Sequence, residues 1–169
     1  MTPQIIKREA ILLCGFSFYG DPFSSHDPWS QENEIGRLWK RFGQYMHPIG
    51  SLPNGINPGT GYEVCITTKE TEQLGHFEVF VGTEVSTVQN LPVDLLVKVL
   101  PPSAYAVFTI KGETIASDWT FELDQSWLPA SGFKRMGNYT FQIYDHRFKG
   151  MDQLTESAID VYIPVAADR

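Results

Sequence analysis

The chain has 169 residues, of which 42% are hydrophobic and 20% charged, a composition that is ordinary for a globular protein able to bury its own core. Its net charge of −7 argues against direct DNA binding, because phosphate contacts need a basic surface, and it favours a cationic or neutral ligand. The N-terminus lacks a signal pattern and no apolar run approaches membrane-spanning length, so we expect a cytoplasmic protein with no membrane partner.

The first half of the chain predicts a strand, a helix and two further strands. The expected elements are a strand over 5–19, a loop over 21–30, a helix that Ser30 caps and that Pro48 ends, a loop over 49–60, and strands over 61–68 and 76–86. The helix follows from apolar residues at three- and four-residue steps, from Ile35 to Met46.

The second half repeats that order. We expect a strand over 104–110, a helix over 113–127, and strands over 139–144 and 158–165. Ile115, Trp119, Leu123 and Trp127 recur every four residues and would form one helix face. The polar segment 146–156 is expected to be a loop.

A short internal similarity supports duplication. The segment Phe77–Gly82 aligns with Ile159–Pro164 without gaps, so that Glu78 matches Asp160 and Phe80 matches Tyr162. The sequence therefore predicts an α+β domain over 1–169, made of two β-α-β-β halves (1–87 and 88–169) with two main helices and an antiparallel sheet.

No residue spacing indicates a metal or cofactor. Cys14 and Cys65 lie in apolar strand-like runs without a CxxC motif, which is typical of free thiols in a reducing compartment. The four histidines are scattered without ligand spacing. We expect neither a metal site nor a cofactor.

Several stretches, in order along nearly the whole chain, resemble the GyrI-like, AraC-type effector-binding family. They are Ile35–Phe42, Gly61–Cys65, Phe77–Val85, Pro101–Gly112, Trp127–Gly132, Tyr144–Phe148 and Ile159–Pro164. The resemblance implies a pseudo-twofold fold with a small-molecule pocket between the halves. Many members are fused to a helix-turn-helix DNA reader, for which this chain has no residues left, so it looks like the single-domain branch.

Asp160 and Glu78 are the acidic candidates for ligand binding. Asp160 interrupts an apolar strand, where a charge is costly unless it is paired, and alternation places it on one face with Tyr162 and Pro164. The resemblance implies an acidic residue at this position that attracts cationic aromatic drugs. If the halves pack about a twofold, Glu78 would approach the same cleft. The alternative for both is a solvated strand face or, for Asp160, a structural hydrogen bond.

Aromatic side chains would supply the pocket walls. The resemblance places Tyr105 and Trp127 near the pocket, and Tyr162, Phe80 and Tyr144 are further candidates for stacking on a flat, cationic ligand. Glu122, in the second predicted helix, is an additional acidic candidate. For Trp39 and Trp119 we expect packing of helix on sheet.

The leading hypothesis is therefore a protein that binds or sequesters a small aromatic or amphipathic molecule. One alternative, implied by hydrolases among the relatives, is a hydrolase that detoxifies alkylating, cyclopropyl-bearing compounds. Another is a protein-interaction role such as modulation of a topoisomerase. A homodimer or another protein partner is left open by the sequence, and so is enzymatic activity.

Overall fold

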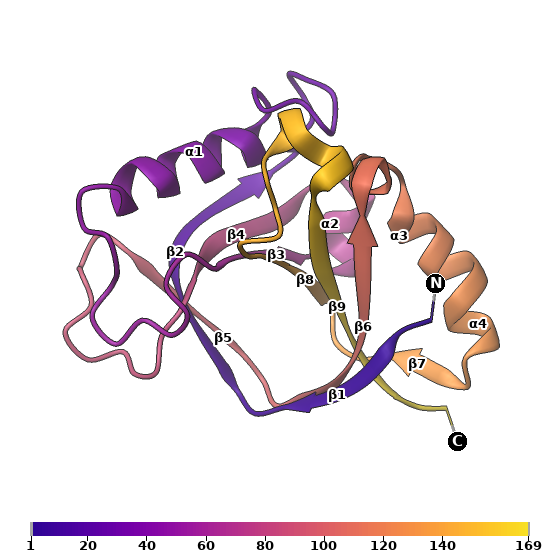
Figure 1. Cartoon of the computed structure of the whole chain (residues 1–169). Coiled ribbons are helices and arrows are strands. Elements are labelled where there is room, and N and C mark those ends of the chain that lie inside the picture. The colour runs from indigo at the N-terminus through magenta and orange to yellow at the C-terminus, as the bar shows by residue number, and fades with distance from the viewer. Residues whose placement is uncertain (1, 169) are drawn as a thin grey trace.

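The computed structural model describes residues 2–168 and contains one curved, antiparallel sheet with helical segments on one face (Figure 1). The strands are β1 (Gln4–Arg8), β2 (Ile11–Gly20), β3 (Gly61–Ile66), β4 (Phe77–Glu84), β5 (Leu96–Leu100), β6 (Ser103–Lys111), β7 (Phe133–Arg135), β8 (Tyr139–Tyr144) and β9 (Ala158–Ala167). Their order is β1-β6-β9-β8-β3-β4-β2-β5, and β7 pairs with β9. The predicted α+β class is confirmed.

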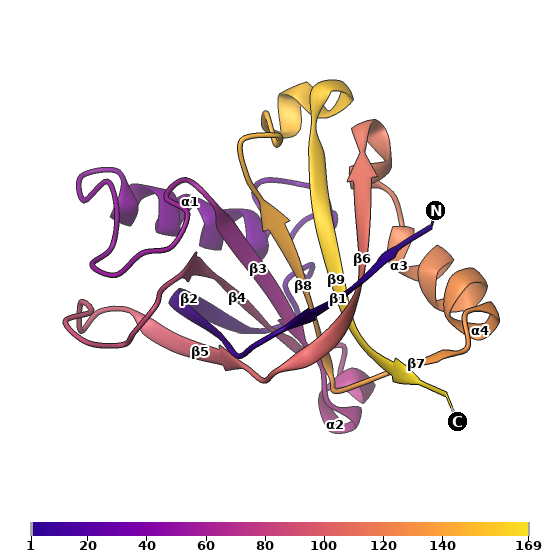
Figure 2. The same ribbon diagram turned by 60° about the horizontal axis from the view of Figure 1, so that its bottom comes forward.

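The first predicted strand is in fact two strands that belong to different ends of the sheet. The chain turns at Glu9–Ala10, so that β1 pairs with β6 whereas β2 pairs with β4 and β5. The prediction of one strand over 5–19 was wrong because local apolar patterning does not reveal which partner each half of a strand finds. Figure 2 shows β1 beside β6 and β5 beside β2 at the two ends of the sheet.

The first helix, α1 (Glu34–Met46), buries Leu38 and Phe42 against the sheet, as its apolar spacing predicts. Its cap is Asn33 rather than Ser30, since the Asn33 side chain accepts a hydrogen bond from the Gly36 N–H at 2.9 Å.

The second predicted helix, over 113–127, is replaced by shorter pieces. A 3-10 turn (Gly112–Ala116) precedes helical segments α3 (Trp119–Glu122) and α4 (Leu128–Ala130), which a π-helical turn (Leu123–Trp127) joins. Asp118 caps α3 and separates it from the 3-10 turn. Ile115, Trp119 and Leu123 are nevertheless buried, so the apolar face was predicted correctly although the helix was not continuous.

Two small elements were not predicted as such. The helix α2 (Lys69–Gln73) lies between β3 and β4, and the expected loop 146–156 contains a 3-10 helix, η3 (Met151–Glu156), between β8 and β9. Both connect the last two strands of their half of the sheet.

The strand registers show a twofold relation between the halves. The sequence repeat aligns Phe80 with Tyr162; Phe80 pairs with Val64 on β3, and Tyr162 pairs with Phe141 on β8. Val64 and Phe141 also pair with each other, so the axis passes between these two residues. The division of the chain at 87/88 stays a prediction.

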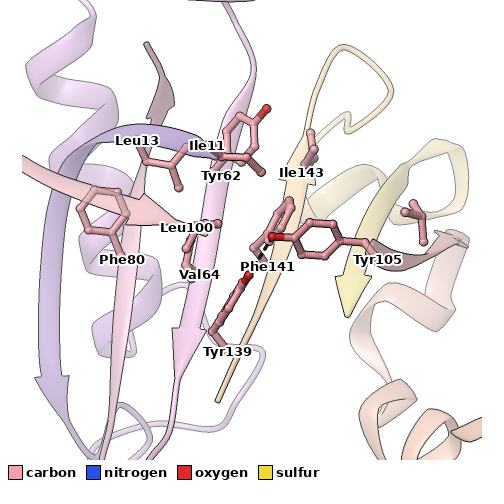
Figure 3. Packing of buried hydrophobic residues seen from close by; sticks show 11 residues of the cluster. Ile11, Leu13, Tyr62, Val64, Phe80, Leu100, Tyr105, Tyr139, Phe141 and Ile143 are labelled. Atoms are coloured by element: carbon pink, nitrogen blue, oxygen red, sulfur yellow. Dashed lines mark hydrogen bonds between the residues drawn. The ribbon is translucent and has the colours of Figure 1, made fainter. Parts of the chain in front are cut away.

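The sheet has a different core on each face. On the face away from the helices, rings from β3, β6, β8 and β9 pack together, and the Tyr105 hydroxyl hydrogen-bonds that of Tyr139 at 2.7 Å (Figure 3). On the same face Arg8 binds Glu84 through both carboxylate oxygens, at 3.0 and 3.1 Å. The other face carries two apolar clusters, one beneath α1 and one beneath α3.

A candidate ligand cavity around Glu63

A cavity of about 600 Å³ lies on the helix-covered face of the sheet, where β3 meets β8. We call it the Glu63 cavity. Its lining residues are Phe23, Pro28, Trp29, Ser30, Gln31, Glu32, Asn33, Ile35, Gly36, Trp39, Lys40, Glu63, Cys65, Phe77, Gln142, Tyr144, Phe148, Gly150 and Met151. Its size falls in the range of small-molecule sites.

Glu63 is the buried carboxylate of this cavity. Its exposed fraction is 6%, and its Oε2 accepts a hydrogen bond of 2.6 Å from the indole Nε1 of Trp39. Its Oε1 accepts no hydrogen bond from the described residues. Burial raises the pKa of Glu63, and the Trp39 hydrogen bond lowers it only in part. Among residues 2–168, no basic side chain forms an ion pair with this acidic group.

Trp39 reaches Glu63 because two features of the sequence meet. Trp39 follows the buried Leu38 on α1, and it packs above Gly61 at the start of β3. A Cβ atom on Gly61 would lie 2.6 Å from the Trp39 ring. The glycine thus leaves the space that the indole occupies while it donates to Glu63.

Aromatic rings form a continuous wall beside the carboxylate. The Tyr144 ring meets that of Trp39 edge-on at 5.0 Å, and that of Phe148 at 4.9 Å. The Tyr144 hydroxyl donates to Gln142 Oε1 at 2.7 Å. Burial and the nearby Glu63 raise the pKa of Tyr144, so the phenol stays neutral. Aromatic walls next to a buried carboxylate suit a flat or bulky cation.

The segment before α1 provides the outer wall, and Asn33 holds it in place. The Asn33 side chain donates to the carbonyl oxygens of Asp27 and Pro28 at 3.1 and 2.9 Å while its own oxygen caps α1. Asn33 is 1% exposed, so both sets of bonds are shielded from water. One side chain thus joins the wall of the cavity to the helix that carries Trp39.

We expect Asn33→Ala to lower the free energy of unfolding by about 1–2 kcal/mol, because a helix cap is lost. Asn33→Asp keeps the cap acceptor but sets a buried carboxylate oxygen against the carbonyl oxygens of Asp27 and Pro28, so it should also lose stability and should increase proteolysis within 21–32. Urea denaturation and limited proteolysis measure the two effects. Equal proteolysis of Asn33→Asp and the unchanged protein would show that the two donated bonds do not hold the segment.

Of the predicted site residues, the structure places Tyr144 in the lining of the Glu63 cavity. Glu78 and Asp160 do share one face of the sheet with Phe80 and Tyr162, as strand alternation predicts, but each has its own partner. Glu78 accepts hydrogen bonds from Ser17 and Lys98, both at 2.7 Å. Asp160 accepts from Thr109 at 2.7 Å and from Arg147 at 2.6 Å. Neither residue lines the Glu63 cavity, and their approach to a common cleft stays a prediction.

The other candidates also lie outside the lining of this cavity. Tyr105, Phe80 and Tyr162 belong to the core on the opposite face of the sheet. Trp127 packs between Phe108 and Phe133 beneath the second helical region. Glu122 is exposed on α3.

Glu63 and Trp39 were missed by the sequence reasoning, although a signal existed. Glu63 interrupts the apolar run Tyr62–Ile66, just as Asp160 interrupts Ile159–Ile163. The family resemblance drew attention to Asp160, and the repeat then added Glu78 as its acidic counterpart. The twofold counterpart of Glu63 is Thr140, so Glu63 gives no repeat signal.

Residues 2–168 contain no group of three His, Cys, Asp or Glu side chains arranged to hold a metal ion. No helix in this part of the chain is long and apolar enough to cross a membrane.

The profile of a protein family described as "Cass2: Integron-associated effector binding protein" matches residues 4–165. No curated protein sequence matches this chain significantly.

Solved structures share the fold at low identity. The structure of SAV2435 bound to tetraphenylphosphonium has a TM-score of 0.69 at 17% identity, covering 98% of this chain and 94% of that one. The integron cassette protein VCH_CASS2 from the mobile metagenome of Vibrio cholerae has a TM-score of 0.64 at 16% identity, covering 98% and 96%. A hydrolase encoded by lin2189 from Listeria innocua has a TM-score of 0.54 at 10% identity, covering 98% and 92%.

Proposed function

We propose that this chain, which belongs to the family of integron-associated effector-binding proteins, binds a small aromatic cation in the Glu63 cavity. The resemblance to GyrI-like effector-binding domains is confirmed by this family match together with the fold neighbours. Effector-binding membership and a ligand-bound neighbour support small-molecule binding in general. The cationic and aromatic nature of the ligand, and the cavity that holds it, are our proposal.

The observation that carries the proposal is the buried carboxylate of Glu63, whose Oε1 accepts no hydrogen bond from residues 2–168. An ionised carboxylate that is buried without a cation costs several kcal/mol, whereas a cationic ligand would supply the missing charge. Trp39, Tyr144 and Phe148 would surround the ligand with ring faces and edges, which attract cations and exclude water. The solved neighbour with tetraphenylphosphonium is a further reason to choose that cation as the probe.

The affinity for tetraphenylphosphonium is expected to rise as the pH increases through the pKa of Glu63. This cation carries no titratable proton, so pH dependence reports on the protein. Burial raises the pKa of Glu63, and the ionised form is the one that attracts a cation. Binding should therefore release a proton. Calorimetry at several pH values and in buffers of different ionisation enthalpy measures both effects, and Glu63→Gln should abolish them.

The stability of the unliganded protein should have the opposite trend. The pKa of Glu63 is higher in the folded state than in the unfolded state. The free energy of unfolding is therefore not reduced at pH values below the ordinary glutamate pKa, where the carboxyl is protonated in both states. Stability then declines as the pH rises from that value towards the raised one. A pH-independent affinity together with a flat stability profile over this window would count against a buried, titrating Glu63.

A second function, hydrolysis of a reactive cyclopropyl-bearing compound, is favoured by the same Oε1 atom. Glu63 could accept a proton from a water molecule whose oxygen bonds to a ring carbon, while the breaking C–C bond leaves its electron pair on the ligand, which then takes up a proton. Incubation with such a compound in excess protein, followed by mass spectrometry, would reveal product one water heavier. Intact compound after long incubation would leave binding as the function.

A further inference from the structure

The floor of the Glu63 cavity continues along the seam between the halves. Successive pairs on β3 and β8 are Gly61–Tyr144, Glu63–Gln142 and Cys65–Thr140, and the Thr67 N–H then donates to the Asn138 carbonyl at 2.9 Å. Since side chains alternate along a strand, these rows all face the helices, about 7 Å apart. The distance from the Glu63 row to the Thr67 row is thus about 13 Å.

A second hollow, of about 690 Å³, lies over the far rows of this floor. We call it the Arg135 groove. Cys65, Thr67 and Thr140 line it from the floor, and Asp124 and Arg135 line it from the side of the second half. Cys65 lines both the Arg135 groove and the Glu63 cavity. The two hollows therefore adjoin at the Cys65–Thr140 row.

The Arg135 groove is the twofold counterpart of the Glu63 cavity, but its chemistry differs. Because Val64 exchanges with Phe141, the position of Glu63 corresponds to Thr140, and that of Tyr144 corresponds to Thr67. Hydroxyl groups thus take the places of the carboxylate and the ring. The duplicated architecture offers two equivalent places, of which one has become acidic and aromatic and the other polar.

The polar groups of the groove are suited to an uncharged partner. The Arg135 Nη2 lies 2.5 Å from Asp124 Oδ1, so these two charges offset each other. Lys69, Glu70 and Glu72 also line the groove and leave one carboxylate in excess, away from the hydroxyl-lined floor. Among the described residues, no hydrogen bond engages the side-chain hydroxyls of Thr67 and Thr140. Both hydroxyls can donate and accept, as an ether or hydroxylated chain requires.

We infer that the ligand is elongated, with an aromatic cationic head in the Glu63 cavity and an uncharged, hydrogen-bonding chain that crosses Cys65 into the Arg135 groove. This inference rests on the proposed function, because the head must bind at Glu63 for the chain to reach the groove. It assigns the groove as a second subsite of the same ligand.

Two probes with the same head test it. Methyltriphenylphosphonium carries the head alone, and a triphenylphosphonium with a hydroxyl-ended tri(ethylene glycol) chain carries both parts. Calorimetry on the unchanged protein is expected to give at least about tenfold tighter binding of the second probe. Thr140→Phe places a ring on the floor of the groove and should remove this gain in affinity. The affinity for methyltriphenylphosphonium should stay within about twofold of that of the unchanged protein.

Matched variants keep the test interpretable. Thr140→Ser retains the hydroxyl and should keep the gain, and Thr67→Phe obstructs the far row if Thr140→Phe does not fold. The second subsite would be overturned if both probes bound the unchanged protein equally well, or if the gain in affinity persisted in both Phe variants. Either result would leave the proposed function at Glu63 unaffected. Failure of both probes to bind would overturn the proposed function and this inference with it.

Discussion

Glu63→Gln is expected to weaken the binding of tetraphenylphosphonium by about 30- to 100-fold, the largest effect among ligand-facing substitutions. A unit charge pair about 6 Å apart at an effective dielectric constant of about 20 is worth about 2.8 kcal/mol. Glutamine keeps the size of the side chain and can still accept from Trp39 Nε1, so the loss reports on charge rather than on packing. Titration calorimetry with both proteins at one pH above neutrality measures it.

Two comparisons separate this effect from a general change in net charge. Glu9→Gln, on the exposed turn between β1 and β2, makes the same chemical change and should leave the affinity within about twofold. Asp160→Asn and Glu78→Gln test the residues that the sequence favoured. If either of these weakens binding as much as Glu63→Gln does, the site has to be relocated to the opposite face of the sheet.

Gly15→Ala is expected to lower the free energy of unfolding by about 3 kcal/mol, through forced movement of the backbone. Gly15 on β2 pairs with Gly82 on β4. A Cβ atom on Gly15 would overlap the carbonyl oxygen of Val81 and would lie 2.5 Å from the Gly82 Cα, so the strands would have to separate. Urea denaturation followed by tryptophan fluorescence measures the loss.

Gly43→Ala is the matched control, because it adds the same methyl group in open space. No atom lies within 4 Å of a Cβ atom built on Gly43, which is in the interior of α1. We expect this variant to be more stable than the unchanged protein by about 0.5–1 kcal/mol, since alanine is the better helix former. If both variants had the same stability, the close approach of β2 and β4 would not be a constraint on the fold.

The fold could be predicted in large part because each half repeats a simple local pattern. Strand alternation placed Asp160 and Tyr162 on one face and Ile159 and Val161 on the other, as the two cores show. The apolar spacing of α1 identified Leu38 and Phe42 as buried. The predictions of one continuous strand over 5–19 and one continuous helix over 113–127 were wrong. The turn at Glu9–Ala10 and the break before Asp118 depend on where the flanking segments find partners.

The candidate site could not be predicted in the same way, because it depends on what the halves do not share. The sequence repeat emphasises Glu78 and Asp160, which have kept acidic counterparts and which the structure pairs with Lys98 and Arg147. Glu63 has a threonine as its counterpart, and Trp39 has the appearance of an ordinary core residue. Because the site residues have no similar residues at the matching positions of the other half, the sequence repeat does not identify them.

By itself, then, the sequence determined the family resemblance, the α+β class and the faces of most strands and of α1, because periodicity and turn residues act over a few neighbours. Only the tertiary structure decided which carboxylate is buried without an ion pair to residues 2–168. Burial of Glu63 requires Trp39 from α1, the missing side chain of Gly61 and the neighbouring strand β8 to meet at one place. Such a meeting is set by packing between segments that are far apart in the chain.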